Sequence, residues 1–378
     1  MNETNNDNLV WETVFTQTAE AFETLRKALE YIGNANIADH MHGTVRVLAS
    51  ILQVQRFEIA VLSFDNCRAH LNAALALFEQ LVSSSGSDAQ DPKARFYSVL
   101  NRLGPTSRLL PGHSIEVQSA EQAAFRFSLS LLILDDIIAS TILLEPPRLS
   151  EYHLPLLSNI DGPSPLDISA VLGCQNTILL HLSAISALSA WKHAHTLAGT
   201  LDVIALVHRA TAIKNPLESH LDTLSTTPVT LPARRHTLLD QTCALSWSNQ
   251  RLFVTRIWGH AALLYLSLVV SGWQPASAEV HRHVDSILDL LDEQTYPPAL
   301  LRSVAWPFCV AGCLATGGQE GRFRGHVDAL GNRSVFGALN KALGIMEGVW
   351  KRREEGRGER GRELADFFRD EGELVLLV

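Results

Sequence analysis

Cysteine is scarce in this chain of 378 residues, and its few copies are scattered. The five cysteines are Cys67, Cys174, Cys243, Cys309 and Cys313. No secretory leader precedes them, because residues 1–10 are rich in asparagine and acid instead of basic and then apolar. An odd number of scattered thiols does not suit a disulfide framework. It predicts a reduced, intracellular compartment, with the thiols buried as small hydrophobic groups.

A basic excess is lacking as well. The formal net charge is −9, and a whole-chain excess of that sign repels the phosphate backbone of nucleic acids. We therefore expect the chain to bind DNA poorly on its own. Ordinary solubility is the simplest role for its acidic residues.

A clear membrane-spanning run is also missing. The best candidate, residues 257–273, contains Gly259 and His260 and falls short of the usual ~20 apolar residues. It lies within a longer amphipathic pattern, which favours a core helix and predicts no membrane partner.

Apolar residues are abundant, at 46% of the chain against 19% charged, which is typical of a globular protein with an ample core. Helical spacing dominates, and no convincing strand alternation is present. Apolar stripes with that spacing run through Val284, Ile287, Leu288 and Leu291, and through Leu339, Leu343, Met346 and Trp350. The prediction is an all-α fold, a globular bundle of about a dozen helices joined by short loops.

Several helix boundaries can be predicted. Asp91 is an N-cap followed by proline, and Ser119 with Gln122 forms a capping box. Gly272 closes a long helix that begins near Leu238.

Other segments are typical of loops. Turn-forming residues predict loops at residues 83–87, 104–112, 161–165, 296–298 and 316–318. The irregular glycines Gly317, Gly318, Gly321 and Gly325 are interpreted as part of a loop. The mixed-charge stretch 351–363 is predicted to be a solvated, mobile tail, with nuclear import as an alternative role.

The pair Asp135-Asp136 raises the question of metal chemistry. It is similar to the aspartates of class I terpene synthases, which hold Mg²⁺ with carboxylates one helical turn apart. Ala139 stands where the third aspartate would be, and no second Asn-Asp metal motif follows. A polar helix surface or a buried capping network is therefore the favoured interpretation, with a Mg²⁺-dependent enzyme as the alternative.

Histidine and cysteine pairs offer no better metal site. Three His-x-His pairs occur, His40/His42, His193/His195 and His281/His283. Residues two apart on a helix point about 200° apart, so such a pair cannot chelate one metal. Cys309 and Cys313 lie one turn apart among apolar neighbours and are predicted to pack in the core.

Catalytic motifs are absent too. No Gly-x-Ser-x-Gly elbow, Walker loop or Gly-x-Gly-x-x-Gly turn occurs in the sequence. We therefore expect no catalytic, cofactor-binding, metal-binding or DNA-binding residue in this chain, and no enzymatic activity.

Six sequence blocks resemble one known family. They are WPFCVAGCLA at 306–315, ALGIMEGVW at 342–350, LDDIIAST at 134–141, PPRLSEYH at 146–153, ISAVLGCQN at 168–176 and ALSAWK at 187–192. Their order and spacing resemble the fungal-specific transcription factor domain, the helical regulatory region of zinc binuclear-cluster activators, from about residue 121 onward. The first hundred residues resemble it only in being helical.

The resemblance implies a regulatory role. It implies an RNA polymerase II transcription regulator in the nucleus of a fungus, controlling a secondary-metabolite gene cluster. Predicted domains are an N-terminal helical region at 1–115, the regulatory domain at 116–350 and a charged tail with a last short helix at 351–378. Expected partners are a zinc-cluster transcription factor or the transcription machinery, with a small-molecule effector as a further candidate.

The zinc cluster of that family is not found in this sequence. Six clustered cysteines, a basic linker and a heptad coil are all missing. We therefore expect zinc, and contact with DNA, only through an N-terminal segment beyond this chain or through a partner. A helical co-regulator without DNA binding is the alternative.

Overall fold

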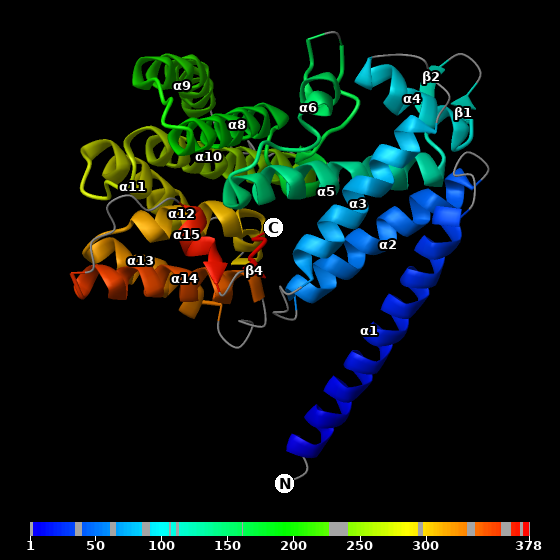
Figure 1. The fold of residues 1–378 in the computed structure, drawn as a ribbon, viewed down its shortest axis with the longest axis horizontal. Coiled ribbons are helices and arrows are strands. Elements are labelled where there is room, and N and C mark those ends of the chain that lie inside the picture. Colours follow the sequence, from blue (N-terminus) through cyan, green and yellow to red (C-terminus); the bar gives the residue numbers. More distant parts are fainter. Residues whose placement is uncertain are drawn as a thin grey trace. The chain divides into compact units, whose positions relative to one another are not determined.

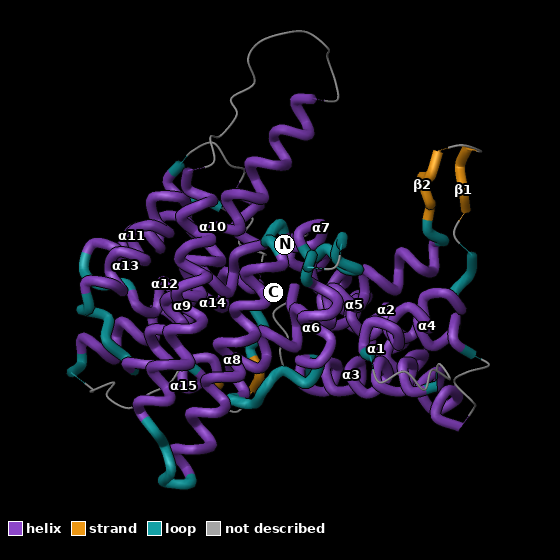
Figure 2. Tube along the Cα trace, turned by 90° about the horizontal axis from the view of Figure 1, so that it is seen from above, coloured by secondary structure: helices purple, strands orange, loops and turns teal. Residues whose placement is uncertain are grey.

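The computed structural model describes residues 3–34, 40–60, 66–84, 91–105, 107–110, 113–160, 162–226, 241–293, 298–330, 337–356, 364–370 and 373–377 (Figure 1). Within these ranges are fifteen α-helices, one 3-10 helix and two short β-hairpins. The predicted all-α class is confirmed, with a few more helices than expected. Helices account for most of the tube in Figure 2.

The chain folds as two compact units. The first comprises Met1–Gln55 and Asn72–Leu129, and the second comprises Arg56–Leu71 and Ser130–Val378. The helices α2, α3 and α5 contribute residues to both. The domain boundaries expected at residues 115 and 350 stay a prediction.

The elements from the N-terminus to α5 are α1 (Glu3–Asn34), α2 (Met41–Ala60), α3 (Cys67–Ser83), α4 (Pro92–Arg102), β1 (Ser107–Leu110), β2 (His113–Val117) and α5 (Ala120–Leu143). The elements that follow are α6 (Ser150–Leu157), α7 (Ser169–Leu172), α8 (Asn176–Leu197), α9 (Val203–Thr226), α10 (Gln241–Ser271), α11 (Ala278–Asp292), the 3-10 helix η2 (Pro298–Val304), α12 (Ala305–Leu314), α13 (Gly318–Asp328), α14 (Gly337–Glu354), α15 (Ala365–Phe368), β3 (Arg369–Asp370) and β4 (Glu373–Leu374).

Both predicted N-terminal caps in the first unit are confirmed. The Asp91 carboxylate accepts hydrogen bonds from the backbone N–H groups of Lys93 and Ala94. Ser119 and Gln122 form a reciprocal box, in which each backbone N–H donates to the other side chain at 3.1 Å. These bonds satisfy N–H groups that have no partner within the helix.

The loop predicted at residues 104–112 was wrong in part. Strands β1 and β2 form an antiparallel hairpin there, with Ser107 opposite Val117 and Leu110 opposite His113 (Figure 2). Strands of four and five residues are too short to show a clear alternation of apolar and polar residues. Backbone pairing therefore left little trace in the sequence.

Helix α10 is the central helix of the second unit. It contacts α8, α9, α11 and α12. Its residues Trp258 and Tyr265 pack on Trp306 of α12, with ring centroids 5.6 and 5.9 Å apart. The indole N–H of Trp258 donates to the carbonyl of Ser303 at 2.8 Å, so this buried polar group is satisfied.

The apolar stretch of α10 is buried within the protein. Residues Ser248–Ser271 are long and apolar enough to cross a membrane, yet 78% of the most apolar window is covered by the fold. Such burial is typical of a core helix, as the sequence predicted. Gly272 ends the helix with a φ of +73°, and its N–H donates to the carbonyl of Leu268. Leu238, the predicted start, lies outside the described residues.

The two C-terminal sequence blocks pack on each other as α12 and α14. A Cβ atom added to Gly312 would lie only 1.8 Å from the sulfur of Met346. The indole N–H of Trp350 donates to the Gly312 carbonyl at 2.8 Å. Only glycine permits so close a contact, and therefore these blocks form a helix-packing joint.

The loop predicted for Gly317, Gly318, Gly321 and Gly325 was wrong for the last three. Gly318, Gly321 and Gly325 lie in helix α13, on an exposed face, while Phe323 and Val327 on the opposite face are buried. Burial of these two side chains outweighs the weak helix propensity of glycine.

The first residues of the predicted mobile tail belong to α14, which runs to Glu354. The guanidinium of Arg353 donates to the carbonyls of Ala315 and Cys313, at 2.6 and 2.9 Å, and so caps the end of α12. Residues 357–363 of that tail lie outside the described residues.

Candidate functional site

Asp135, in helix α5, faces a structural partner. Its carboxylate is fully buried and accepts a hydrogen bond from the guanidinium of Arg56 in α2. Burial raises the pKa of Asp135 to about 6, and Arg56 opposes that rise. This ion pair joins residues 56–60 of α2 to α5. Removing either partner from a buried ion pair costs about 3–5 kcal/mol.

Asp136 has a different partner. Its two carboxylate oxygens accept hydrogen bonds from the backbone N–H groups of Arg148 and Leu149, at 3.1 and 2.8 Å. Burial raises its pKa to about 6, while these two N–H groups lower it. The aspartates thus point to separate partners and do not face a common cavity. The buried capping network predicted from the sequence is confirmed for Asp136.

The two members of the pairs His40/His42 and His281/His283 have different surroundings. His40 packs edge-on against Tyr31, and His42 is exposed. His195 contacts Trp191 and forms a 2.9 Å hydrogen bond with the Thr200 hydroxyl.

His281 and His283 lie on different sides of α11. His281 hydrogen bonds with the Thr316 hydroxyl at 3.1 Å, whereas His283 contacts His260 in α10. The geometric reason given above, side chains pointing about 200° apart, accounts for this separation.

The pair His260–His283 was not found from the sequence. The two Nδ1 atoms lie 3.1 Å apart, so one neutral ring donates to the other. Burial lowers the pKa of His260 to about 3 and that of His283 to about 4. Arg256, Arg282 and Lys214 also disfavour a positive charge there, and Glu279 favours it at His283. No local signal could have joined residues 23 positions apart.

The described cysteines do not fit a zinc cluster. Cys67 begins α3, Cys174 follows α7, and both are fully buried and form no disulfide. Cys309 and Cys313 are buried in α12, where burial and the neighbouring thiol raise the pKa of Cys309 well above its usual range. Within the described ranges, no three His, Cys, Asp or Glu side chains gather in a way that could hold a metal ion.

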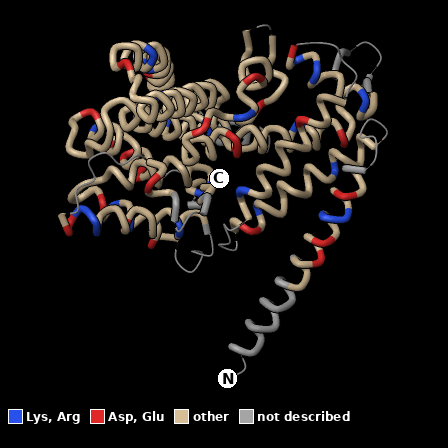
Figure 3. The backbone as a smooth tube through the Cα atoms, viewed as in Figure 1, with Lys and Arg blue, Asp and Glu red and all other residues tan. Residues whose placement is uncertain are grey.

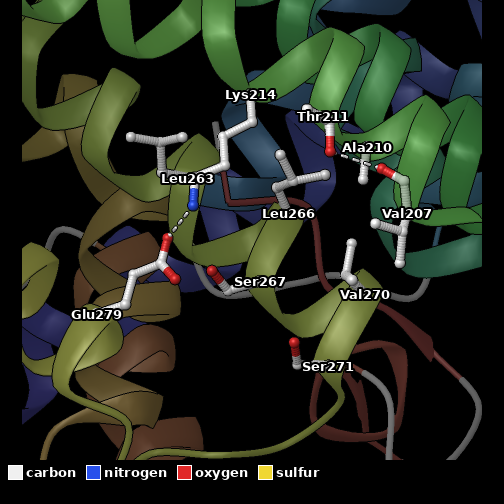
Figure 4. A pocket seen from close by; sticks show the side chains of 10 residues that line it. All are labelled: Val207, Ala210, Thr211, Lys214, Leu263, Leu266, Ser267, Val270, Ser271 and Glu279. Atoms are coloured by element: carbon white, nitrogen blue, oxygen red, sulfur yellow. Dashed lines mark hydrogen bonds and ion pairs between the residues drawn. The ribbon is translucent and has the colours of Figure 1, made fainter.

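One cavity of the second unit lies between α9 and α10. It is a cavity of about 180 Å³, with Glu279 of α11 at one end (Figure 4). Its lining residues are Val207, Ala210, Thr211, Lys214, Leu263, Leu266, Ser267, Val270, Ser271 and Glu279. None of them belongs to a sequence block that suggested the family, and sequence reasoning did not locate the cavity.

The two halves of α9 differ around Pro216, which explains the space. A proline inside a helix removes one backbone hydrogen bond and permits a kink. After Pro216, Leu217 and Leu221 are buried, and a Cβ atom added to Gly259 of α10 would lie 2.5 Å from Leu221. Before Pro216, small side chains such as Ala210 face α10 and leave the cavity between them.

The polar end of the cavity is an ion pair. The Lys214 ammonium donates to the Glu279 carboxylate at 2.7 Å, and both side chains are about one-third exposed. Lys214 is the first cause that lowers the pKa of Glu279, which therefore stays charged. Among the described residues the hydroxyls of Ser267 and Ser271 form no hydrogen bond, so both can serve a ligand.

Charged residues of both signs are distributed over the described helices. Figure 3 shows Lys and Arg interspersed with Asp and Glu, and α8 and α10 carry few charged residues of either sign. Arg322, for example, pairs with Asp289 and Asp292. A duplex would meet no continuous basic stripe along this part of the chain.

Comparisons with known proteins give a consistent result. The family model described as "Fungal specific transcription factor domain" matches residues 4–377. Transcription factor dibT of Pestalotiopsis microspora is 33% identical over 356 residues, which are 92% of this chain and 56% of that protein. The trichothecene biosynthesis transcription regulator TRI10 of Trichoderma arundinaceum is 28% identical over 338 residues, covering 88% of this chain and 74% of that protein.

A third relative is the ustiloxin B cluster transcription factor ustR of Aspergillus flavus, 27% identical over 304 residues, or 79% of this chain and 49% of that protein. The chain thus spans about half the length of dibT and ustR. No solved structure matches it significantly. The family match extends through residues of both compact units, including most of the first hundred residues. The chain belongs to the fungal specific transcription factor domain family.

Proposed function

We propose that this chain is the regulatory region of a fungal transcription regulator that controls a secondary-metabolite gene cluster. One observation carries the proposal: the family model matches residues 4–377, and the similar proteins are named as regulators of such clusters or pathways. The relatives are longer than this chain, so the activity of a whole regulator is part of the proposal.

The Mg²⁺-dependent enzyme loses its only support. It rested on Asp135 and Asp136, and these carboxylates hold Arg56 and the backbone N–H groups of residues 148 and 149. Neither aspartate lines the cavity between α9 and α10. The relatives are named as transcription factors and regulators, which are not enzymes.

We propose that a zinc-cluster segment outside this chain, or a partner protein, makes the contact with DNA. The net charge of −9 and the burial of the described cysteines suit a body that relies on a zinc-cluster segment or on a partner regulator. Action in the nucleus follows from such a role. The same observations support the second candidate, a co-regulator that binds a zinc-cluster relative and not DNA.

Deletion of the gene tests the proposed function. Transcripts of one contiguous biosynthetic cluster should fall several-fold under producing conditions and return when the wild-type gene is restored. A transcriptome that is unchanged under many growth conditions would contradict the proposal. A fluorescent fusion should gather in the nucleus.

Mapping the transcript start separates the two candidates. A transcript that begins upstream and encodes six clustered cysteines in the same reading frame makes the chain the regulatory half of an activator. A transcript that begins at Met1 favours the co-regulator, and a pull-down should then recover a zinc-cluster protein.

A further inference from the structure

The cavity between α9 and α10 combines an apolar wall with one ion pair. Val207 and Ala210 of α9 face Leu266 and Val270 of α10, and Lys214 with Glu279 closes the polar end (Figure 4). Binding sites for small molecules commonly have this composition, in which a few polar groups orient a mostly apolar ligand.

The volume limits the size of the enclosed part of a ligand. An apolar cavity of about 150 Å³ in a protein accommodates benzene, so a cavity of about 180 Å³ suits one ring with a short substituent. The exposed side chains Val203, Ile204 and Val207, with 62%, 83% and 47% of their surface accessible, extend the apolar surface outward from the cavity. A longer apolar ligand can lie along that strip.

The charge of the polar end selects the ligand's polar group. Among the lining residues, Lys214 and Glu279 carry opposite charges, so a ligand ion of either sign meets one attractive and one repulsive group at similar distance. Glu218, whose carboxylate lies 3.9 Å from the Lys214 ammonium, does not line the cavity. A neutral hydroxyl can accept from the ammonium and donate to the carboxylate, and the Ser267 hydroxyl offers a third partner. The polar end thus favours a hydroxyl over a carboxylate or an amine.

We propose that the cavity between α9 and α10 binds a neutral, mainly apolar small molecule with one hydroxyl group, placed between Lys214 and Glu279. The hydroxyl contacts the ion pair, and the apolar body lies between Val207, Ala210 and Leu266. Such a ligand bridges α9 to α10 and α11. Its role as a signal rests on the proposed function, whereas binding itself does not.

Four matched probes test the proposed ligand class with the purified chain of residues 1–378. They are 4-ethylphenol, ethylbenzene, 4-ethylbenzoate and 4-ethylbenzylamine, and binding is measured by ligand-observed NMR titration. The phenol should bind at least about tenfold more tightly than either ion, a difference of about 1.4 kcal/mol, with ethylbenzene in between. Equal binding of all four probes, or no binding to the folded chain, would overturn the proposal.

Cavity filling tests the location. Ala210→Leu should weaken binding of 4-ethylphenol about tenfold or more, because the larger side chain occupies the space. Ala212→Leu is the matched control, since Ala212 is exposed on α9 and does not line the cavity. If Ala210→Leu does not fold, Ser267→Leu fills the same space from α10. Unchanged affinity in a folded cavity-filling variant places the probe elsewhere and sinks the proposal.

Charge changes test the polar end without filling the cavity. Glu279→Gln removes the carboxylate nearest to Lys214 and leaves only Glu218, 3.9 Å from the ammonium, so 4-ethylbenzoate should gain about tenfold in affinity and overtake the phenol. Lys214→Met should favour 4-ethylbenzylamine in the same way. If neither substitution changes the order of the probes, the ion pair does not select the ligand. Transcript measurements are independent of these titrations, so failure of the proposed function is distinguishable from failure of this site.

Discussion

The cluster around Asp135 and Asp136 and the cavity between α9 and α10 lie in the same compact unit but differ in how their polar groups are used. At the aspartates, carboxylate oxygens bind a guanidinium and two backbone N–H groups inside a packed core. At the cavity, the Lys214–Glu279 pair and two serine hydroxyls adjoin open space. The aspartates that stand out in the sequence therefore stabilise the fold, whereas the residues that line the proposed binding site do not stand out.

The largest effect is expected at Asp136. Asp136→Ala leaves the N–H groups of Arg148 and Leu149 without acceptors in a buried place, which should cost about 2–5 kcal/mol of unfolding free energy. Urea denaturation should show a clearly lower midpoint. Glu145→Ala, an exposed acid in the following turn, is the control and should change little. Equal midpoints for the two variants would contradict the stabilising role given to the Asp136 carboxylate.

A second effect is expected on the stability of the fold at low pH. The pKa values of about 3 for His260 and about 4 for His283 lie below the usual 6.5, so both are neutral in the folded chain. The unfolded chain binds protons first, and stability is therefore full above pH 6.5 and falls as the pH drops toward 4. Asp135 and Asp136 act in the opposite direction, since their raised pKa values favour the folded chain between pH 6 and 4.

A double variant isolates the histidine contribution. His260→Gln with His283→Gln keeps both aspartates but removes the two histidines, so the wild type should lose stability relative to this variant, by roughly several kcal/mol, as the pH falls from 7 to 4. Urea titrations at several pH values measure it. Parallel pH profiles for the two proteins would show that the pair does not titrate as the geometry implies.

A smaller effect is expected where α9 and α10 meet. Gly259→Ala would place a methyl group against Leu221 and should cost about 1 kcal/mol while shifting α9. Gly344→Ala is matched, because that helical glycine has nothing within 4 Å, and it should be neutral or stabilise by about 0.5 kcal/mol. The first variant alone should also alter the affinity for 4-ethylphenol.

The smallest change in stability is expected at the mouth of the cavity. Val207→Ser should alter unfolding by less than about 0.5 kcal/mol, because the side chain is already half exposed. It should nevertheless weaken 4-ethylphenol binding several-fold, as an apolar contact is lost. Asp136→Ala should show the reverse pattern, a large loss of stability and unchanged probe binding per folded molecule.

Local features of this fold were predictable from sequence, and long-range partners were not. The caps at Asp91 and Ser119 depend on residues two or three positions away, and both were predicted. Asp136 binds N–H groups 12 and 13 residues later, and His283 contacts a residue 23 positions earlier. No spacing rule encodes those contacts. The glycines of α13 were wrongly predicted to form a loop, because burial of Phe323 and Val327 outweighs the weak helix propensity of glycine.

The tight joint at Gly312 and Met346 has a practical consequence for how proteins of this kind are recognised. Sequence similarity in these blocks indicates a shared fold but carries no information about the ligand. Two members could score alike yet answer to unrelated metabolites, because the residues that would tell those metabolites apart, such as Val207, Lys214 and Glu279, lie outside every block. Sorting such proteins by the residues that line this cavity would group them by the ligand that we propose it binds, and not by descent alone.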